Sequence, residues 1–182
     1  MILFQSYYNP KNKDRKKEIE YCLKRNLENP SIEKIVLFID NDQVKYPNHE
    51  KIEIAQLLEN QLSFAETFSY ACKHYKDSIC CLANNDIFLD HEAFQDLSEI
   101  QNLVENNVVL SLSRHEYNVH TKIAERDATF ARLLFAHTQD AWVWKADFVP
   151  KDSNFYIGTL GSDNAINHRL RESKKIPINL HG

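Results

Sequence analysis

The stretch "CCLANNDIFLD" (residues 80–90) begins with an apolar run and turns polar at Asn84-Asn85-Asp86. A short apolar run without alternation is typical of a strand buried on both faces, as at the centre of a parallel sheet. Asn and Asp side chains suit the turn that ends such a strand, and carboxylate oxygens also suit a divalent cation. The stretch predicts a buried strand over 78–84, and it leaves open whether the polar end is only a turn or an acidic metal site.

Segments of strand and helix character alternate along the rest of the chain. Expected strands cover 2–8, 34–40, 107–113 and 140–148, and expected helices cover 12–28, 91–105 and 163–173, the last capped by Ser162. Ser63 and Glu66 form a capping box for one more helix, and 51–58 is either a strand or a helix start. This alternation predicts the α/β class, with a mostly parallel sheet flanked by helices.

The composition is that of a globular protein with one domain. The chain has 182 residues, 43% of them apolar and 26% charged, and its net charge is -4. An acidic balance argues against nucleic acid as a partner. The basic group at Lys11, Lys13, Arg15, Lys16 and Lys17 is expected to be a solvated helix face. No apolar run is long enough for a transmembrane segment, and the N-terminus does not suit a signal peptide.

The cysteines and glycines limit the possible cellular location and the possible types of nucleotide site. Cys22, Cys72, Cys80 and Cys81 form no C-x-x-C pair and stand at apolar positions, so we expect buried free thiols and a reducing, cytoplasmic location. The chain has only three glycines, which excludes the G-x-G-x-x-G dinucleotide motif and the Walker A loop. A nucleotide would have to be bound by another arrangement.

Polar residues gather where the expected strands end. Ligands of open α/β sheets lie at the carboxyl ends of the strands. The residues at these ends are Ser6, Tyr7, Asp40, Asn84, Asp86, Ser113 and Arg114. Acids and amides thus stand where a site is expected.

Four segments together resemble a known family. They are "LANNDIFLD" (82–90), "VLSLSRHE" (109–116), "TQDAWVWKADF" (138–148) and "FYIGTLGSDNAINHRL" (155–170). In order and spacing they resemble small glycosyltransferase-like proteins of the GT-A fold, in the nucleotide-diphospho-sugar transferase superfamily, whose "ANSDI" strand end replaces the usual Asp-x-Asp motif. The resemblance covers about residues 1 to 180. It implies a single GT-A-like domain over 1–182, with a missing C-terminal segment left open.

The resemblance also implies a set of site residues. Donor-binding roles fall to Ser6, Tyr7, Asp40, Asn84, Arg114, Gln139 and Asn164. The implied metal ligands are Asp86 and His181, although His181 is also simply a terminal residue. Asp140 and Asp163 are the implied catalytic residues. For Asp163, three roles stay open: base, substrate binding and helix capping, since a helix N-terminus stabilises a carboxylate.

The implied reaction is transfer of a sugar from a UDP- or GDP-sugar to a glycan or another hydroxyl acceptor. The leaving nucleoside diphosphate gains negative charge, which Mn²⁺ or Mg²⁺ neutralises. An inactive nucleotide-sugar or glycan-binding module is the alternative, because Asn84 replaces a carboxylate. A third reading takes "IVLFIDND" (35–42) as the motif of a haloacid-dehalogenase-like phosphatase, with Asp40 as nucleophile and Asp42 as acid/base.

The aromatic residues and remaining histidines carry weaker expectations. Trp142 and Trp144 alternate on a strand with one exposed face, and either pack in the core or stack on a ligand. The less regular stretch 115–137 carries His115, His120 and His137, which are expected on the surface.

Overall fold

A seven-stranded sheet forms the centre of the part of the chain that the computed structural model describes, which is residues 1–40, 44–57, 61–118, 123–125 and 139–179. The strand order is β3-β2-β1-β4-β8-β5-β9. The strands are β1 (Ile2–Tyr7), β2 (Lys34–Ile39), β3 (Ile52–Leu57), β4 (Ile79–Ala83), β5 (Val108–Leu112), β8 (Ala141–Lys145) and β9 (Ile176–Ile178). The segment that left strand and helix open is therefore a strand, β3.

Strand β8 runs against its neighbours, whereas the other strands of this sheet are parallel. It lies between β4 and β5, with Ala141 opposite both Ala83 and Leu112. The carboxyl ends of β1, β4 and β5 therefore meet the amino end of β8. We call this side of the sheet the carboxyl edge.

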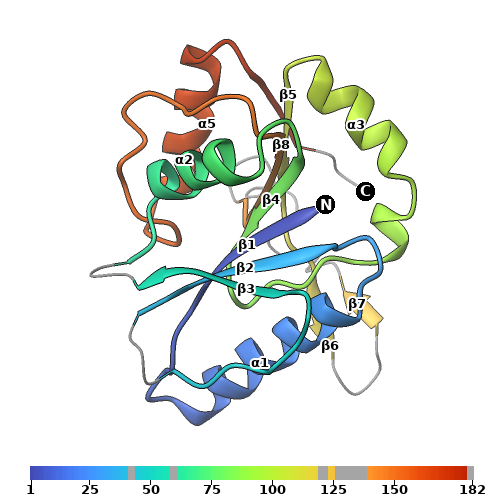
Figure 1. The fold of residues 1–182 in the computed structure, drawn as a ribbon, viewed down its shortest axis with the longest axis vertical. Coiled ribbons are helices and arrows are strands. Elements are labelled where there is room, and N and C mark those ends of the chain that lie inside the picture. Colours follow the sequence, from blue (N-terminus) through green and yellow to red (C-terminus); the bar gives the residue numbers. More distant parts are fainter. Residues whose placement is uncertain (41–43, 58–60, 119–122, 126–138, 180–182) are drawn as a thin grey trace.

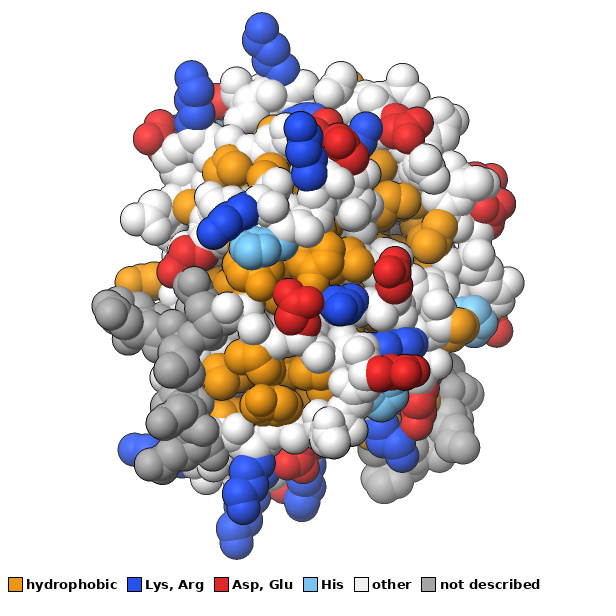
Figure 2. All heavy atoms as spheres, in the orientation of Figure 1, with side chains coloured by type: hydrophobic (Ala, Val, Ile, Leu, Met, Phe, Trp, Pro, Cys, Tyr) orange, Lys and Arg blue, Asp and Glu red, His pale blue; other side chains and the backbone are white. Residues whose placement is uncertain are grey.

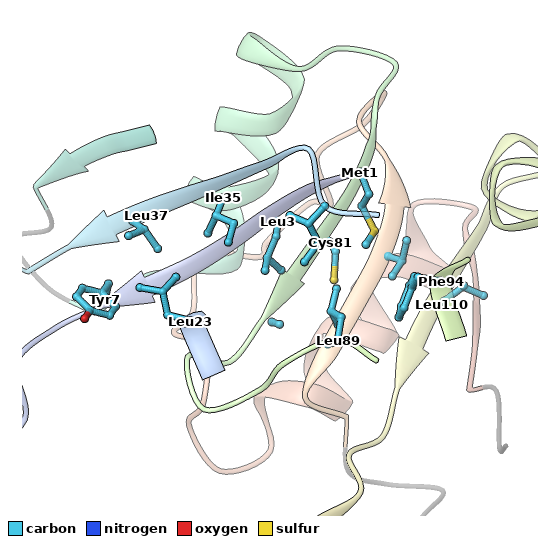
Figure 3. Packing of buried hydrophobic residues seen from close by; sticks show 14 of the residues in the cluster. Met1, Leu3, Tyr7, Leu23, Ile35, Leu37, Cys81, Leu89, Phe94 and Leu110 are labelled. Carbon is cyan, nitrogen blue, oxygen red and sulfur yellow. The ribbon is translucent and has the colours of Figure 1, made fainter. Parts of the chain in front are cut away.

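Helices cover both faces of the sheet, and Figure 1 shows α1 on one side with α2 and α5 together on the other. The helices are α1 (Lys13–Glu28), α2 (Phe64–His74), α3 (Leu97–Glu105) and α5 (Ser162–Glu172). One core cluster joins α1 and α3 to the sheet and includes Leu3, Leu23 and Cys81 (Figure 3). The other joins α2 and α5 to the opposite face and includes Phe68 and Trp144. The expected α/β class with flanking helices is confirmed.

The helix starts follow local chemistry. Asn12 caps α1, where its Oδ1 accepts the backbone N–H of Asp14 at 2.8 Å. Ser63 and Glu66 form the expected capping box of α2. The expectation that Ser162 caps α5 was wrong, because Gly161 holds the cap position with a φ of 81°, a conformation that favours glycine.

Both tryptophans are core residues. Trp142 is 1% exposed and Trp144 is fully buried, and the Trp144 ring lies 4.3 Å from the ring of Phe68 between centroids. The expectation of one exposed face on this strand was wrong, because β8 has neighbours on both edges and helices over both faces. These residues therefore pack the centre of the molecule.

Four short elements were not anticipated. One is strand β9, at the edge of the seven-stranded sheet. Strands β6 (Glu116–Asn118) and β7 (Ile123–Glu125) pair as a hairpin inside the stretch expected to be irregular, and η1 (Glu92–Phe94) precedes α3. His115 is exposed, as expected. Asp42, His120, His137 and His181 lie outside the described residues.

The cysteines and the surface agree with the composition. All four cysteines are free thiols, as expected, but only Cys22, Cys80 and Cys81 are buried, and Cys72 is half-buried. Burial raises the pKa of the Cys22 thiol to about 12. No helix among the described residues is both long and apolar enough to cross a membrane. On the face drawn in Figure 2, cationic and anionic side chains are interspersed.

Leu170 and Leu160 offer a matched test of the core on the α5 side. Leu170 is fully buried, whereas Leu160 is fully exposed. We expect Leu170→Ala to lower the free energy of unfolding by about 2–5 kcal/mol, because the truncation leaves a cavity. Leu160→Ala should change it by less than about 0.5 kcal/mol. Urea unfolding measures both, and equal effects would contradict this packing.

Candidate functional site

Two buried amides hold the backbone that follows β4. Gln5 Nε2 donates to the carbonyl oxygens of Asn84 at 2.9 Å and Ile87 at 3.2 Å. Asn26 Nδ2 donates to the same Ile87 oxygen at 3.0 Å, and its Oδ1 accepts the N–H of Leu89 at 2.9 Å. Gln5 is 2% exposed and Asn26 is fully buried. Hydrogen bonds made away from water therefore fix the segment that carries Asp86.

Asn84 and Asp140 meet at the carboxyl edge through two hydrogen bonds. The backbone N–H of Asn84 donates to the Asp140 carbonyl at 3.0 Å, and Asn84 Nδ2 donates to Asp140 Oδ1 at 2.8 Å. The Arg114 guanidinium lies 3.7 Å from the same Oδ1. The structure therefore brings together three of the predicted site residues, which come from the ends of β4 and β5 and the start of β8.

Asp140 is a carboxylate in an unusual environment. Its side chain is 13% exposed. Burial is the main cause that raises its pKa above the ordinary value, and the negative charges of Asp86 and Asp163 add to the increase. Arg114 and the hydrogen bond from Asn84 oppose it. Asp140 thus holds a proton to higher pH than an exposed aspartate, which suits a group that exchanges a proton with a substrate.

Gln139 links the start of β8 to α5. Its backbone N–H donates to Asp163 Oδ2 at 3.3 Å, and its Oε1 accepts Asn167 Nδ2 at 2.8 Å. Asn167 Oδ1 in turn accepts the hydroxyl of Ser111 at 2.8 Å. Gln139 is 5% exposed, so its side chain serves this internal network. Sequence reasoning missed Asn167, although its place four residues after Asp163, on the buried side of an amphipathic helix, was a usable signal.

Asp163 is already bound to backbone donors. Besides the N–H of Gln139, its carboxylate accepts the N–H of Asn164 at 3.0 Å. Asn164 itself is exposed. Of the three roles left open for Asp163, this geometry matches a structural one best, because Oδ1 bonds within the first turn of α5 and Oδ2 ties that turn to Gln139.

Asp86 forms an ion pair with Arg15 of α1. Arg15 Nη1 lies 2.7 Å from Asp86 Oδ2, and Arg15 Nη2 donates to Asn85 Oδ1 at 3.4 Å. The basic group around Arg15 was expected to be solvated, and this holds for the exposed Lys16 and Lys17. It was wrong for Arg15, because this side chain turns toward the carboxyl edge and is only 34% exposed.

The remaining predicted donor-binding residues lie apart from this cluster. Tyr7 is 6% exposed and packs in the core on the α1 side. It lines a pocket of about 140 Å³ beside Tyr8 and Val44, smaller than the roughly 300–1,000 Å³ typical of ligand sites. Asp40 is exposed at the end of β2, which β1 separates from β4.

Ser6 is the exception among these residues. The register of β1 on β4 pairs Phe4 with Leu82, and extending this register puts Ser6 level with Asn84. Ser6 is half-buried. It is therefore the predicted residue of β1 that lies nearest the cluster.

The acidic residues have the right chemistry for a divalent cation, but each has a cationic partner. The oxygens of Asp86 and Asp140 are the donors that Mg²⁺ and Mn²⁺ prefer. Arg15 pairs with Asp86, and Arg114 lies beside Asp140. Within the described ranges, no three His, Cys, Asp or Glu side chains already form a metal-binding group. A cation at Asp86 would require Arg15 to move away from that carboxylate.

Comparisons with known proteins bear on the fold. No protein-family model matches the chain, and no curated protein matches it by sequence. Among solved structures, the 2-C-methyl-D-erythritol 4-phosphate cytidylyltransferase IspD of Francisella tularensis is 15% identical, with a TM-score of 0.55 over 98% of this chain and 88% of that one. The fold is nucleotidyltransferase-like.

Two further structures have the same nucleotidyltransferase-like fold. The 4-diphosphocytidyl-2C-methyl-D-erythritol synthase of Anaerococcus prevotii is 13% identical, with a TM-score of 0.56 over 100% of this chain and 88% of that one. S. aureus TarS (1–349) is 13% identical, with a TM-score of 0.54 over 93% of this chain. The match covers 54% of TarS 1–349, so this chain spans about half of it. Identities this low show the fold alone.

Asn26→Ala should loosen the segment after β4. The change removes the buried amide that contacts Ile87 and Leu89, and an unsatisfied buried group costs about 1–3 kcal/mol. We expect the free energy of unfolding to fall by about this amount, and amide hydrogen exchange at Leu89 to accelerate. The exposed Asn154 is the matched control, since Asn154→Ala should change neither quantity. Unchanged exchange at Leu89 in Asn26→Ala would contradict the proposed anchoring.

Asp140→Asn should change how stability depends on pH. Because the folded-state pKa of Asp140 is raised above its ordinary 3.8, its stabilising contribution is full below pH 3.8 and is lost as pH rises through the raised value. The free energy of unfolding of the wild type, relative to Asp140→Asn, should therefore fall as pH rises from 3.8. Urea unfolding at a series of pH values measures it. The exposed Asp90, changed to Asn, is the control, and a pH-independent difference for Asp140→Asn would refute the raised pKa.

Proposed function

We propose that the protein is a GT-A-type glycosyltransferase, which moves a sugar from a nucleotide-diphosphate sugar to a hydroxyl acceptor with help from a divalent cation. The observation that carries the proposal is the convergence of Asn84, Arg114 and Asp140 at the carboxyl edge. This is where open α/β sheets bind their ligands. Three of the four sequence segments of the GT-A resemblance supply these same residues, which supports the proposal from the sequence as well as from the geometry.

Asp140 is the residue best suited to take the proton of the acceptor hydroxyl. The acceptor oxygen forms a bond to the anomeric carbon, the bond from that carbon to the diphosphate oxygen breaks, and the hydroxyl proton goes to the carboxylate. The contacts from Asn84 and Arg114 both reach Oδ1, which orients the carboxylate. The raised pKa makes this carboxylate a stronger base than an exposed aspartate. Asp163, the other catalytic candidate, is assigned to holding the start of α5.

Two cationic groups would meet the diphosphate. Arg114, with a side chain 54% exposed, carries positive charge at the same edge. A Mn²⁺ or Mg²⁺ ion bound by Asp86, with Asp140 nearby, would supply charge neutralisation for the leaving diphosphate. The proposed donor is a UDP- or GDP-sugar, and the proposed acceptor is a glycan or another hydroxyl compound.

The fold gives further support for a nucleotide substrate. Two neighbours are named as a cytidylyltransferase and a diphosphocytidyl-methylerythritol synthase, names that refer to cytidine nucleotides. The proposal extends nucleotide binding from these proteins to this chain. The four free thiols support a reducing compartment, and we propose the cytoplasm.

A non-catalytic nucleotide-sugar or glycan-binding module is the second candidate. It is favoured by the amide of Asn84, which stands where a carboxylate is usual, and by the engagement of Asp86 with Arg15. The phosphatase reading gains no support, because Asp40 is exposed and separated from the cluster by β1.

Titration calorimetry with UDP and GDP, with and without Mn²⁺, followed by turnover assays on a panel of nucleotide sugars, tests the proposal. Asp86→Asn should abolish Mn²⁺-dependent nucleotide binding. Asp140→Asn should keep binding and lower transfer by roughly 10²–10⁴-fold, as expected for loss of a general base.

Asp90→Asn is the matched control for both variants, since Asp90 is exposed four residues beyond Asp86, and it should behave as the wild type. Nucleotide binding without turnover in the wild type would favour the binding module. Binding that is unaffected by Asp86→Asn would refute the cation site.

A further inference from the structure

We infer that Arg15 competes with the divalent cation for Asp86 and thereby sets the affinity of the site for that cation. The inference rests on the proposed function, because it takes Asp86 as a cation ligand. It concerns a residue of α1 that neither the strand ends nor the family resemblance pointed to.

The contact itself is close and directional. Arg15 Nη1 lies 2.7 Å from Asp86 Oδ2, while Nη2 reaches Asn85 Oδ1 at 3.4 Å. A guanidinium and a divalent cation both bind carboxylate oxygens, and their like charges repel each other at such short range. Arg15 must therefore leave the Asp86 carboxylate, at least in part, when a cation binds there.

Arg15 is the partner that is free to move. The backbone oxygen of Asp86 accepts the thiol of Cys22 at 3.1 Å, and the buried Gln5 and Asn26 hold the residues on either side. Arg15, in contrast, lies in the first turn of α1 with its side chain 34% exposed. Its Nη1 also lies 2.8 Å from Glu18 Oε2, one turn further along the helix. Glu18 can therefore remain the ion-pair partner of the guanidinium after the contact with Asp86 is broken.

The charges around the site explain why this exchange matters. The carboxylate of Asp140 interacts electrostatically with those of Asp86 and Asp163, and within the described part of the chain Arg15 pairs with Asp86 and Arg114 lies beside Asp140. With Arg15 on Asp86, the edge holds less excess negative charge than its acids alone would give. Removing the Arg15 charge should therefore strengthen cation binding. In the wild type, Asp86 stays paired when no cation is bound, and the affinity for the cation is lower as a result.

Direct Mn²⁺ titration of the full chain, without nucleotide, tests the inference by calorimetry. Arg15→Gln should bind Mn²⁺ roughly fivefold more tightly than the wild type, a change of the size expected for a partly exposed ion pair. Arg15→Lys, which keeps the charge, should lie between the two. Asp86→Asn should lose binding in both the wild-type and the Arg15→Gln background.

Lys17→Gln is the matched control. It removes one positive charge two residues from Arg15 on α1, but Lys17 pairs with Asp14 and not with Asp86. Its Mn²⁺ affinity should equal that of the wild type, which separates loss of the Asp86 contact from a general change in charge. Circular dichroism of each variant checks that the fold is kept.

Two results would overturn the inference, and they differ in what else they remove. If Arg15→Gln binds Mn²⁺ no more tightly than the wild type while Asp86→Asn binds it less tightly, Arg15 is not a competitor and the proposed cation site stands. If neither the wild type nor Arg15→Gln binds Mn²⁺, the competition and the cation role of Asp86 fail together. Nucleotide titration in the absence of metal then decides whether the rest of the proposed function survives.

Discussion

The antiparallel pairing of β8 with β4 and β5 is the constraint from which the arrangement of the candidate site follows. A strand that entered this position in the parallel sense would bring its far end, Lys145, to the carboxyl edge. Because β8 runs the other way, the residues just before it arrive there instead, and Asp140 meets Asn84 through one backbone and one side-chain hydrogen bond. The same direction puts Gln139 next to α5, so one strand orients both sides of the cluster.

Buried amides hold this arrangement where apolar side chains would be more usual. Gln5, Asn26 and Asn167 are each almost fully buried, and each spans two segments that are distant in the sequence. A buried amide without partners is costly, so each one favours the single geometry in which its donors and acceptors are met. The residues of the candidate site are thus positioned by these buried amides, which lie beneath them in the interior of the protein.

Much of the fold was predictable because its signals are local. The apolar runs that became β1, β2 and β4, and the caps at Asn12 and Ser63, depend on residues close in the sequence. The clustering of acids and amides at strand ends followed from the parallel sheet.

The direction of β8 was not predictable, since an antiparallel strand has the same apolar pattern. The partner of Arg15 lies 71 residues away, and three-residue strands such as β6, β7 and β9 carry too little pattern to recognise. Both Ser6 and Tyr7 were assigned to the site. Successive residues of a strand point to opposite faces of the sheet, however, and the Tyr7 side chain packs in the core on the α1 side.

The burial of the two tryptophans gives the protein an optical property. Trp142 and Trp144 are the only tryptophans in the chain, and both lie in β8, just after Asp140. Intrinsic fluorescence excited in the indole band therefore comes from this single strand at the centre of the sheet. A change in the emission spectrum therefore reports on the packing of β8, which directly follows the site residue Asp140, without any label being attached.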